Sequence, residues 1–145
     1  MRIISGRLRG KRIKIPKYIN VRPTTDQSKE AIFNILANRY DLNEIKVLDL
    51  FSGTGSISFE FSSRGVKTVY SVDKSYNSIK FIKKFSDENN LKYYTDLLST
   101  LRKKLSISNG SLLILEHPEN INLKEQEDVI ETRKYGSCFF SFLNL

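Results

Sequence analysis

The sequence is poor in cysteine, histidine and long apolar runs. Cys138 is the single cysteine among 145 residues, so no disulfide can form within the chain and a reducing cytoplasm is expected. His117 is the single histidine, and without a Cys/His cluster we expect no metal site. No apolar run reaches the roughly 18 residues of a membrane span. Residues 1–4 lead into charges rather than an apolar stretch, so no signal peptide is expected.

Positive charge is in excess. Lysine and arginine number 24 against 16 aspartate and glutamate, a formal net charge of +8. This excess favours an anionic partner, nucleic acid before a membrane surface, although a solvated basic surface is the alternative. In residues 2–15, apolar residues alternate with cations, and Gly6 and Gly10 punctuate the stretch. We expect a basic β-hairpin there, which either contacts nucleic acid or is simply solvated.

The predicted site centres on residues 47–55, VLDLFSGTG. The apolar residues at its start are typical of a parallel strand that is covered on both faces. Gly53 and Gly55 let the backbone turn tightly and approach a ligand, and an apolar helical face follows from Ser56. Such a strand, turn and helix N-terminus form a nucleotide-type site, because unpaired amides converge there. Asp49 would repel a phosphate and therefore favours a ligand with a cationic or hydroxyl group.

Strands and helices alternate along the chain, which predicts one α/β domain with a mostly parallel sheet. Its parts are a hairpin and helix in residues 1–40 and a binding core in residues 45–145. Helices are expected at about 26–38, from 56, at 77–85 and at 97–105, and strands at 47–50, 66–72, 92–95, 112–115 and 138–143. Residues 121–131 are expected to form a short helix or loop. Asp73 ends the second strand of a β-α-β unit, where an acidic residue accepts hydrogen bonds from ribose hydroxyls, unless it caps the next helix.

Several blocks of the sequence fit one family. They are MRIISGRLRGKR at 1–12, VRPTTD at 21–26, KEAIFN at 29–34, VLDLFSGTG at 47–55, LILEH at 113–117 and RKYGS at 133–137. The stretch at 47–55 resembles the cofactor loop of S-adenosylmethionine-dependent methyltransferases. The other blocks resemble the beginning and the closing strands of the bacterial 16S rRNA guanine-N2 methyltransferases of the RsmD type. The resemblance covers nearly the whole chain.

The resemblance implies a Rossmann-like methyltransferase sheet with an antiparallel C-terminal strand, S-adenosylmethionine as cofactor, and a cytoplasmic monomer that acts on 16S rRNA or the small ribosomal subunit. It implies that Asp49 lies near the cofactor's ammonium group, Asp73 near its ribose and Asp96 near its adenine. The expected cofactor-binding residues are Asp49, Phe51, Ser52, Gly53, Thr54, Gly55, Asp73 and Asp96. The expected RNA-binding residues are Arg2, Arg7, Arg9, Lys11, Arg12 and Arg22.

One motif of that family is missing. Its members carry Asp/Asn-Pro-Pro-Tyr/Phe after the fourth strand, which binds the target amine and stacks on the base. The prolines here are Pro16, Pro23 and Pro118, and residues 97–111 are too few for the motif and its flanking elements. The chain therefore resembles a member that is shortened internally near residues 93–100.

The shortening predicts a rearranged sheet and weak or absent methyl transfer. The strand at 112–115 is expected to take the vacant position and pair with the strand at 47–50, because buried unpaired backbone groups are costly. Glu116, His117 and Pro118 would then stand in for the catalytic motif. Cofactor binding is expected to survive.

Two other functional classes stay open on the sequence. The first is a non-catalytic RNA-binding remnant, which would bind through the basic hairpin with a steep salt dependence. The second is an enzyme that uses a nicotinamide cofactor. Asp49 argues against it, as does the lack of a third glycine at the dinucleotide spacing. His117 is a conceivable general base, but a lone histidine beside a proline at a strand end is more often structural.

Overall fold

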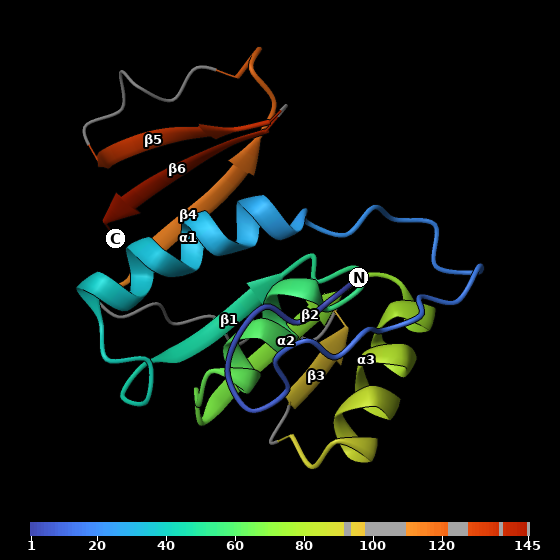
Figure 1. Ribbon diagram of the computed structural model, residues 1–145. Helices are drawn as coiled ribbons and strands as arrows, with labels where there is room; N and C mark the ends of the chain where they lie inside the picture. Colours follow the sequence, from blue (N-terminus) through green and yellow to red (C-terminus); the bar gives the residue numbers. More distant parts are fainter. Residues whose placement is uncertain (92–93, 98–109, 122–127, 137, 145) are drawn as a thin grey trace. The chain divides into compact units, whose positions relative to one another are not determined.

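The computed structural model describes residues 1–91, 110–121, 128–136 and 138–144, and the backbone of residues 94–97. The chain divides into two compact units, Met1–Lys104 and Leu105–Leu145 (Figure 1). The single domain expected from the sequence stays a prediction. In the described part of the chain, no helix combines the length and apolarity needed to cross a bilayer.

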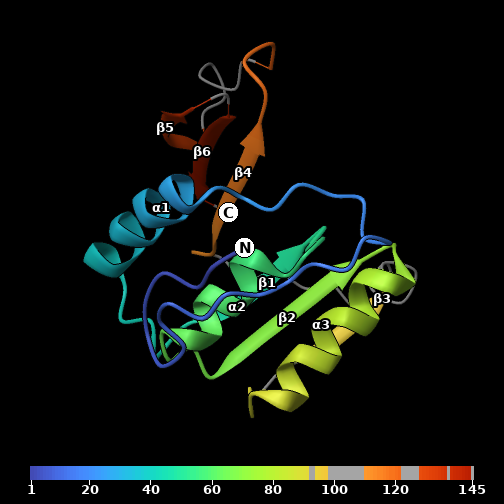
Figure 2. The same cartoon turned by 45° about the vertical axis from the view of Figure 1, so that its right-hand side comes forward.

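The first unit contains the expected β-α-β-α-β order. Its elements are α1 (Asp26–Arg39), β1 (Lys46–Leu50), α2 (Ser56–Ser63), β2 (Thr68–Asp73), α3 (Tyr76–Glu88) and β3 (Tyr94–Leu97). The three strands form a parallel sheet in the order β1-β2-β3. Helices α2 and α3 lie along one face of this sheet (Figure 2). The Rossmann-like α/β arrangement predicted for this part is confirmed.

Hydroxyl side chains cap the N-termini of α1 and α3. The Thr25 hydroxyl accepts a hydrogen bond from the Ser28 amide at the start of α1, and the Ser75 hydroxyl accepts one from the Ser78 amide at the start of α3. Each bond satisfies one of the amides that a helix N-terminus leaves unpaired. The alternative in which Asp73 caps α3 is wrong, because Ser75 occupies that position.

The N-terminal segment, residues 1–15, folds back on itself and enters the core. Its antiparallel pairing is a single bridge between Arg2 and Arg12, supported by a hydrogen bond of 3.0 Å from the Ile3 amide to the Lys11 carbonyl. The predicted hairpin is thus present as a folded-back loop rather than as two long strands. Ile3 and Ile13 are buried in one cluster with Phe59, Ile82 and Phe85 of α2 and α3.

Strand β1 is less covered than the sequence predicts. It is an edge strand of its sheet, and Leu48 and Leu50 keep 37% and 36% of their surface exposed. The expectation of a strand covered on both faces is therefore wrong for these two residues. The expected pairing of residues 112–115 with β1 would join the two units and stays a prediction. Within its own unit, that strand pairs with β6.

The second unit is an antiparallel sheet in the order β4-β6-β5, made of β4 (Leu112–His117), β5 (Val129–Tyr135) and β6 (Cys138–Asn144). Residues 112–117 pair in continuous register with residues 139–144. β4 lies at the edge of this sheet, so β6 satisfies the backbone groups along one side of β4. The core is provided by β6, whose Phe140, Phe142 and Leu143 are buried.

Strand β5 differs in part from the prediction. A helix or loop is expected up to residue 131, whereas the resemblance puts residues 133–137 among the closing strands. The largely polar sequence VIETRKY pairs with β6 along residues 129–135, with a bulge between Val129 and Glu131. The apolar partner decides its conformation, which its own sequence does not reveal. Of the helix expected at 97–105, residue 97 ends β3, and the rest lies outside the described residues.

Candidate cofactor site and cationic segment

The glycine turn, residues 51–55, leaves the end of β1 and leads into α2. Phe51, Gly53 and Gly55 all have a left-handed backbone, with φ of 62°, 54° and 72°. Left-handed backbone at the phenylalanine costs about 1–3 kcal/mol, and such strain is concentrated at ligand-binding positions. Phe51 is 70% exposed, so an apolar surface stands beside the turn.

The turn is tied firmly to β2. The Ser52 amide donates to the Val72 carbonyl at 2.9 Å. The Ser52 hydroxyl donates to the carbonyls of Asp49 and Val72 and accepts from the Val72 amide. The Thr54 side chain is buried as well. The Ser52 side chain therefore fixes the turn. Because both side chains are buried, the backbone of these two expected cofactor residues is the part that can face a ligand.

The two glycines are required for different reasons. A Cβ atom at Gly55 would come within 2.9 Å of Ile82 and 3.0 Å of the Phe59 ring, so Gly55 allows α2 to begin against α3. A Cβ atom at Gly53 would come within 3.2 Å of Val21 Cγ2. Val21 therefore lies against the turn, and this brings the neighbouring Arg22, an expected RNA-binding residue, near it.

Asp73 connects the turn with the end of β2. Its Oδ2 accepts a hydrogen bond of 2.7 Å from the Gly53 amide, and its Oδ1 accepts one of 2.8 Å from the Ser75 amide. Each carboxylate oxygen can accept a second hydrogen bond. The position therefore suits a ligand that carries neighbouring hydroxyl groups. Asp96 stands opposite Val72 in β3, one position before the partner of Asp73, but its side chain lies outside the described residues.

Asp49 is held in an unusual environment. The Ser58 hydroxyl of α2 donates to Asp49 Oδ2, and it also bonds the Ser71 hydroxyl of β2. Burial raises the pKa of Asp49 to about 6, the hydrogen bonds from Ser58 oppose this rise, and the charge of Asp73 adds to it. A carboxylate that is costly to ionise alone is stabilised by a nearby cation. The site thus favours a ligand with an ammonium group. Sequence patterns gave no signal for the roles of Ser58 and Ser71.

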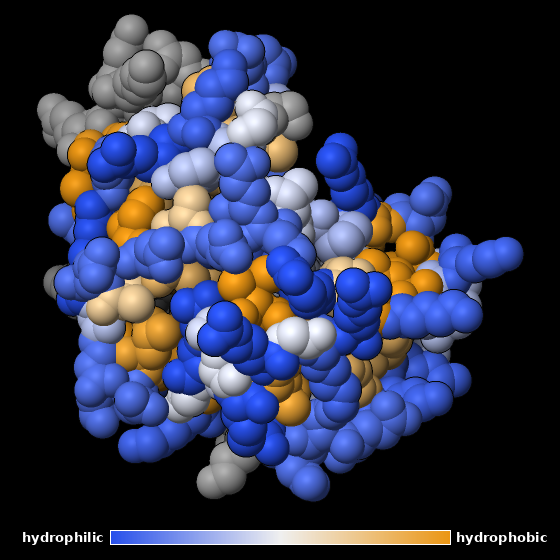
Figure 3. Space-filling view, viewed as in Figure 1, coloured by the Kyte–Doolittle hydropathy of each residue, from blue (hydrophilic) through white to orange (hydrophobic). Residues whose placement is uncertain are grey.

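The expected RNA-binding cations of the N-terminal segment are exposed. Arg2 forms an ion pair of 3.1 Å with Asp26, and Arg7 donates to the Asn89 carbonyl at 2.9 Å. The Lys11 ammonium donates a hydrogen bond to the side-chain oxygen of Asn89. Hydrophilic side chains dominate the face of the molecule that Figure 3 shows. The segment can therefore present several cations to phosphate groups.

The predicted stand-ins for the catalytic motif lie at the end of β4. His117 Nε2 is 2.9 Å from the Ser141 hydroxyl, and Nδ1 is 3.0 Å from the Pro118 carbonyl oxygen. Both ring nitrogens are thus used within the second unit. A catalytic role of Glu116, His117 and Pro118 depends on the expected pairing of residues 112–115 with β1, which would join the two units and stays a prediction. The described residues also contain no group of three or more metal-ligating side chains.

A family model and several known proteins match the chain. The model described as Conserved hypothetical protein 95 matches residues 1–95. "Putative rRNA methyltransferase YlbH" of Bacillus subtilis is 39% identical over 83 residues, which cover 57% of this chain and 44% of that protein. "Ribosomal RNA small subunit methyltransferase D" of Haemophilus influenzae is 32% identical over 132 residues, covering 87% of this chain and 67% of that protein. The chain spans less than half the length of the first of these relatives.

Solved structures share the fold. A hypothetical protein of Thermus thermophilus superposes with a TM-score of 0.83 at 21% identity, covering 100% of this chain and 99% of the other. A putative methyltransferase, yhhF, of Escherichia coli superposes with a TM-score of 0.77 at 19% identity, covering 99% and 97%. These TM-scores show a common fold.

Proposed function

Since the chain belongs to the family Conserved hypothetical protein 95, and its relatives include Ribosomal RNA small subunit methyltransferase D, we propose that it is an S-adenosylmethionine-binding protein of the 16S rRNA guanine-N2 methyltransferase type. It acts in the cytoplasm as a monomer, and its partner is 16S rRNA or the small ribosomal subunit. The observation that carries this proposal is the pair Asp49 and Asp73 around the glycine turn.

The residues of the turn fit this cofactor. Asp49 offers a half-buried carboxyl with a raised pKa, whose ionisation a neighbouring ammonium would stabilise. Asp73 offers oxygens that already organise the turn and can accept from ribose hydroxyls as well. The cofactor supplies a methyl group on a sulfonium, which is already an activated electrophile. The protein must therefore bind, orient and desolvate the reacting groups.

The RNA-binding residues are proposed to be Arg2, Arg7, Arg9, Lys11, Arg12 and Arg22. Exposed cations that contact phosphates release counterions, so the affinity should fall steeply with salt. Arg22 is the proposed RNA-binding residue beside the cofactor site, since its neighbour Val21 lies against Gly53. Its guanidinium can hold a phosphate while the base reaches the turn.

The catalytic step is proposed to be weak. The chain has no Pro-Pro pair, and the side chains that hold the target amine in related enzymes have no counterpart in the sequence. Orientation of two reactants contributes a large part of a rate enhancement, of the order of 7–11 kcal/mol. Glu116, His117 and Pro118 remain proposed stand-ins, and a non-catalytic RNA-binding protein is the second candidate because the motif is missing.

Calorimetric titration with S-adenosylmethionine tests the cofactor assignment. Asp73→Asn should weaken binding about 10- to 100-fold, because hydrogen bonds to a charged group contribute about 1.5–3 kcal/mol. Asp87→Asn, at an exposed position of α3, is the matched control and should bind normally. No heat of binding with the unmodified chain would refute the assignment.

Transfer of a labelled methyl group to small ribosomal subunits separates the two candidates. Label in the rRNA that depends on Asp73 supports the enzyme. Salt-dependent binding of rRNA without any label supports the RNA-binding remnant.

A further inference from the structure

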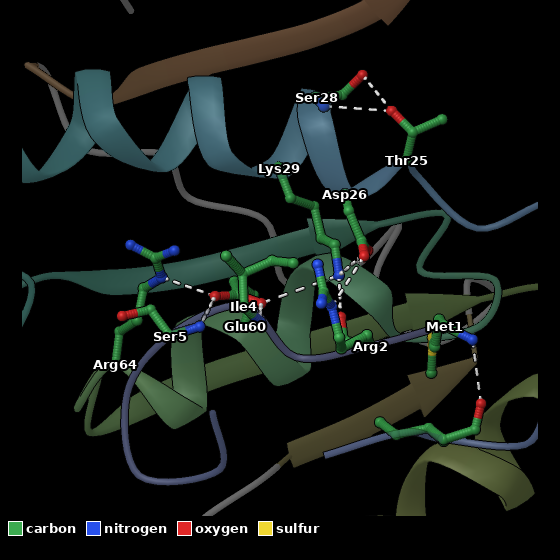
Figure 4. A network of polar contacts seen from close by, with 11 residues as sticks. Met1, Arg2, Ile4, Ser5, Thr25, Asp26, Ser28, Lys29, Glu60 and Arg64 are labelled. Carbon is green, nitrogen blue, oxygen red and sulfur yellow. Dashed lines mark hydrogen bonds and ion pairs between the residues drawn. The ribbon is translucent and has the colours of Figure 1, made fainter. Parts of the chain in front are cut away.

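Helix α2 connects the two parts of the proposed site. It begins at Ser56, directly after Gly55 of the glycine turn, and residues near its other end bind the N-terminal segment (Figure 4). Glu60 lies five positions after Gly55, which is about 7.5 Å along a helix axis. The contacts of Glu60 and Ser63 attach the N-terminal segment to α2.

Glu60 is a fully buried carboxylate whose oxygens are bound to two consecutive amides. Its side chain is 0% exposed. Oε2 accepts from the Ile4 amide at 2.9 Å, and Oε1 accepts from the Ser5 amide at 3.0 Å. Arg64 Nε donates to Oε1 at 2.9 Å, and the ammonium of Lys29 lies 3.9 Å from Oε2. A buried carboxylate is tolerated only when its oxygens are paired in this way.

Ser63 holds the same segment one turn later. Its hydroxyl donates to the Ser5 carbonyl at 2.6 Å and accepts from the Leu8 amide at 2.9 Å. Its own carbonyl accepts from the Arg7 amide at 2.7 Å. Gly6 has φ of 80°, and a Cβ atom there would overlap this carbonyl. Residues 4–8 therefore lie on α2 in a single register.

Lys29 adds the helix α1 to this connection. Its ammonium donates to the Arg2 carbonyl and lies 3.4 Å from Asp26, and its side chain is 1% exposed. Asp26 in turn pairs with the Arg2 guanidinium. A proposed RNA-binding arginine is thus oriented by the same network that contains Glu60.

The hydrogen bonds of Glu60 and Ser63 constrain the N-terminal segment differently from the apolar contacts beside them. Ile3 and Ile13 already attach the segment to α2 and α3 through the apolar cluster. Apolar burial is not directional, so it attaches the segment without fixing its position along the helix. Hydrogen bonds from consecutive amides to one carboxylate fix that position, because a shift by one residue would leave the buried charge unpaired.

We propose that Glu60 and Ser63 are positioning residues that hold the RNA-binding cations of the N-terminal segment at a fixed distance from the methyl donor, with α2 as the rigid spacer. This inference rests on the proposed function. It assigns to α2 a part in placing the RNA, in addition to its part in forming the cofactor turn.

The test compares Glu60→Gln with Glu30→Gln, an exposed control in α1. The glutamine amide group faces one of the two backbone amides, so that amide loses its acceptor. We expect faster hydrogen exchange at the Ile4 and Ser5 amides and at least tenfold weaker binding of a 16S rRNA fragment. The slope of log affinity against log salt should become less steep by about 0.9 for each phosphate that the segment no longer binds. Calorimetric affinity for S-adenosylmethionine should stay within twofold.

The outcomes distinguish the inference from the function on which it rests. An unchanged RNA affinity and salt slope in Glu60→Gln would overturn the positioning role while leaving the proposed function intact. A parallel loss of RNA and cofactor affinity would make Glu60 a purely structural residue and also overturn it. If the unmodified chain binds the cofactor but no RNA, the proposed RNA function itself fails. If Glu60→Gln does not fold, Ser63→Ala provides the same measurements.

Discussion

Replacing Asp49 by asparagine removes a carboxyl that the folded chain ionises only at a cost. Burial raises the pKa of Asp49 from 3.8 to about 6. The folded protein therefore binds this proton more tightly than the unfolded chain does. Between these two pKa values the folded state carries more protons, so the free energy of unfolding falls as the pH rises. The cost is absent below pH 3.8 and complete above about pH 6.

The size of this effect follows from the pKa difference. One pKa unit corresponds to about 1.36 kcal/mol, so ionising Asp49 in the folded protein costs about 3 kcal/mol above pH 6. Asparagine keeps the shape of the side chain and an oxygen that can accept from Ser58, but it has no charge to bury. We therefore expect Asp49→Asn to be more stable than the unmodified protein by up to about 3 kcal/mol at pH 7, and nearly equal to it at pH 4.

Urea unfolding at several values between pH 4 and pH 7, followed by circular dichroism, measures this difference. Comparison of the variant with the unmodified protein at each pH removes the contributions of the other carboxyls. Asp87→Asn, exposed on α3, is the control and should follow the unmodified protein throughout. A variant that gains no stability between pH 4 and pH 7 would show that Asp49 is not held in a raised-pKa environment.

Asp49→Asn should weaken cofactor binding, although it is expected to stabilise the fold. An ammonium beside Asp49 favours the carboxylate and lowers its pKa, so binding should release a proton below about pH 6. The affinity of the unmodified protein should then rise with pH towards 6, while Asp49→Asn binds weakly without this pH dependence. Calorimetry in two buffers of different ionisation enthalpy reports the released proton. Equal affinity of both proteins would place the ammonium elsewhere.

Two further predictions concern stability. Gly6→Ala should lower the free energy of unfolding by about 2–4 kcal/mol, because its Cβ atom would overlap the Ser63 carbonyl. Gly10→Ala, which has the same φ of 80° but nothing within 4 Å, should cost only about 1–2 kcal/mol, and equal losses in urea unfolding would contradict the steric explanation. Phe142→Ala should cost about 3–5 kcal/mol, since Phe142 is fully buried in β6. Leu115→Ala, at a partly exposed position of β4, should cost clearly less in the same measurement.

Local features were predictable because neighbouring residues determine them. The helix expected at about 26–38 is present as α1, where the Thr25 hydroxyl accepts a hydrogen bond from the Ser28 amide. Asp49 and Asp73 were located by the spacing of one β-α-β unit. The apolar run at 138–143 was sufficient to predict β6. In each case the interactions that fix the conformation lie within a few residues or follow a regular period.

The remaining features depend on contacts between distant residues. The sequence of β5 is largely polar, and its conformation follows from pairing with β6. Glu60 looks like an ordinary helical residue, yet it accepts hydrogen bonds from amides more than fifty positions away. The local sequence pattern does not predict these partners, because they are brought together only when the chain is folded.

The sequence by itself thus determined the family, the order of elements in the first unit and the two carboxylates at the glycine turn. The tertiary structure decided that residues 112–117 pair with β6, that Gly55 serves the packing of α2 on α3, and that α2 binds the N-terminal segment. The physical reason is that strand pairing and buried charges are selected by which partners can satisfy them. Those partners are far apart in the chain.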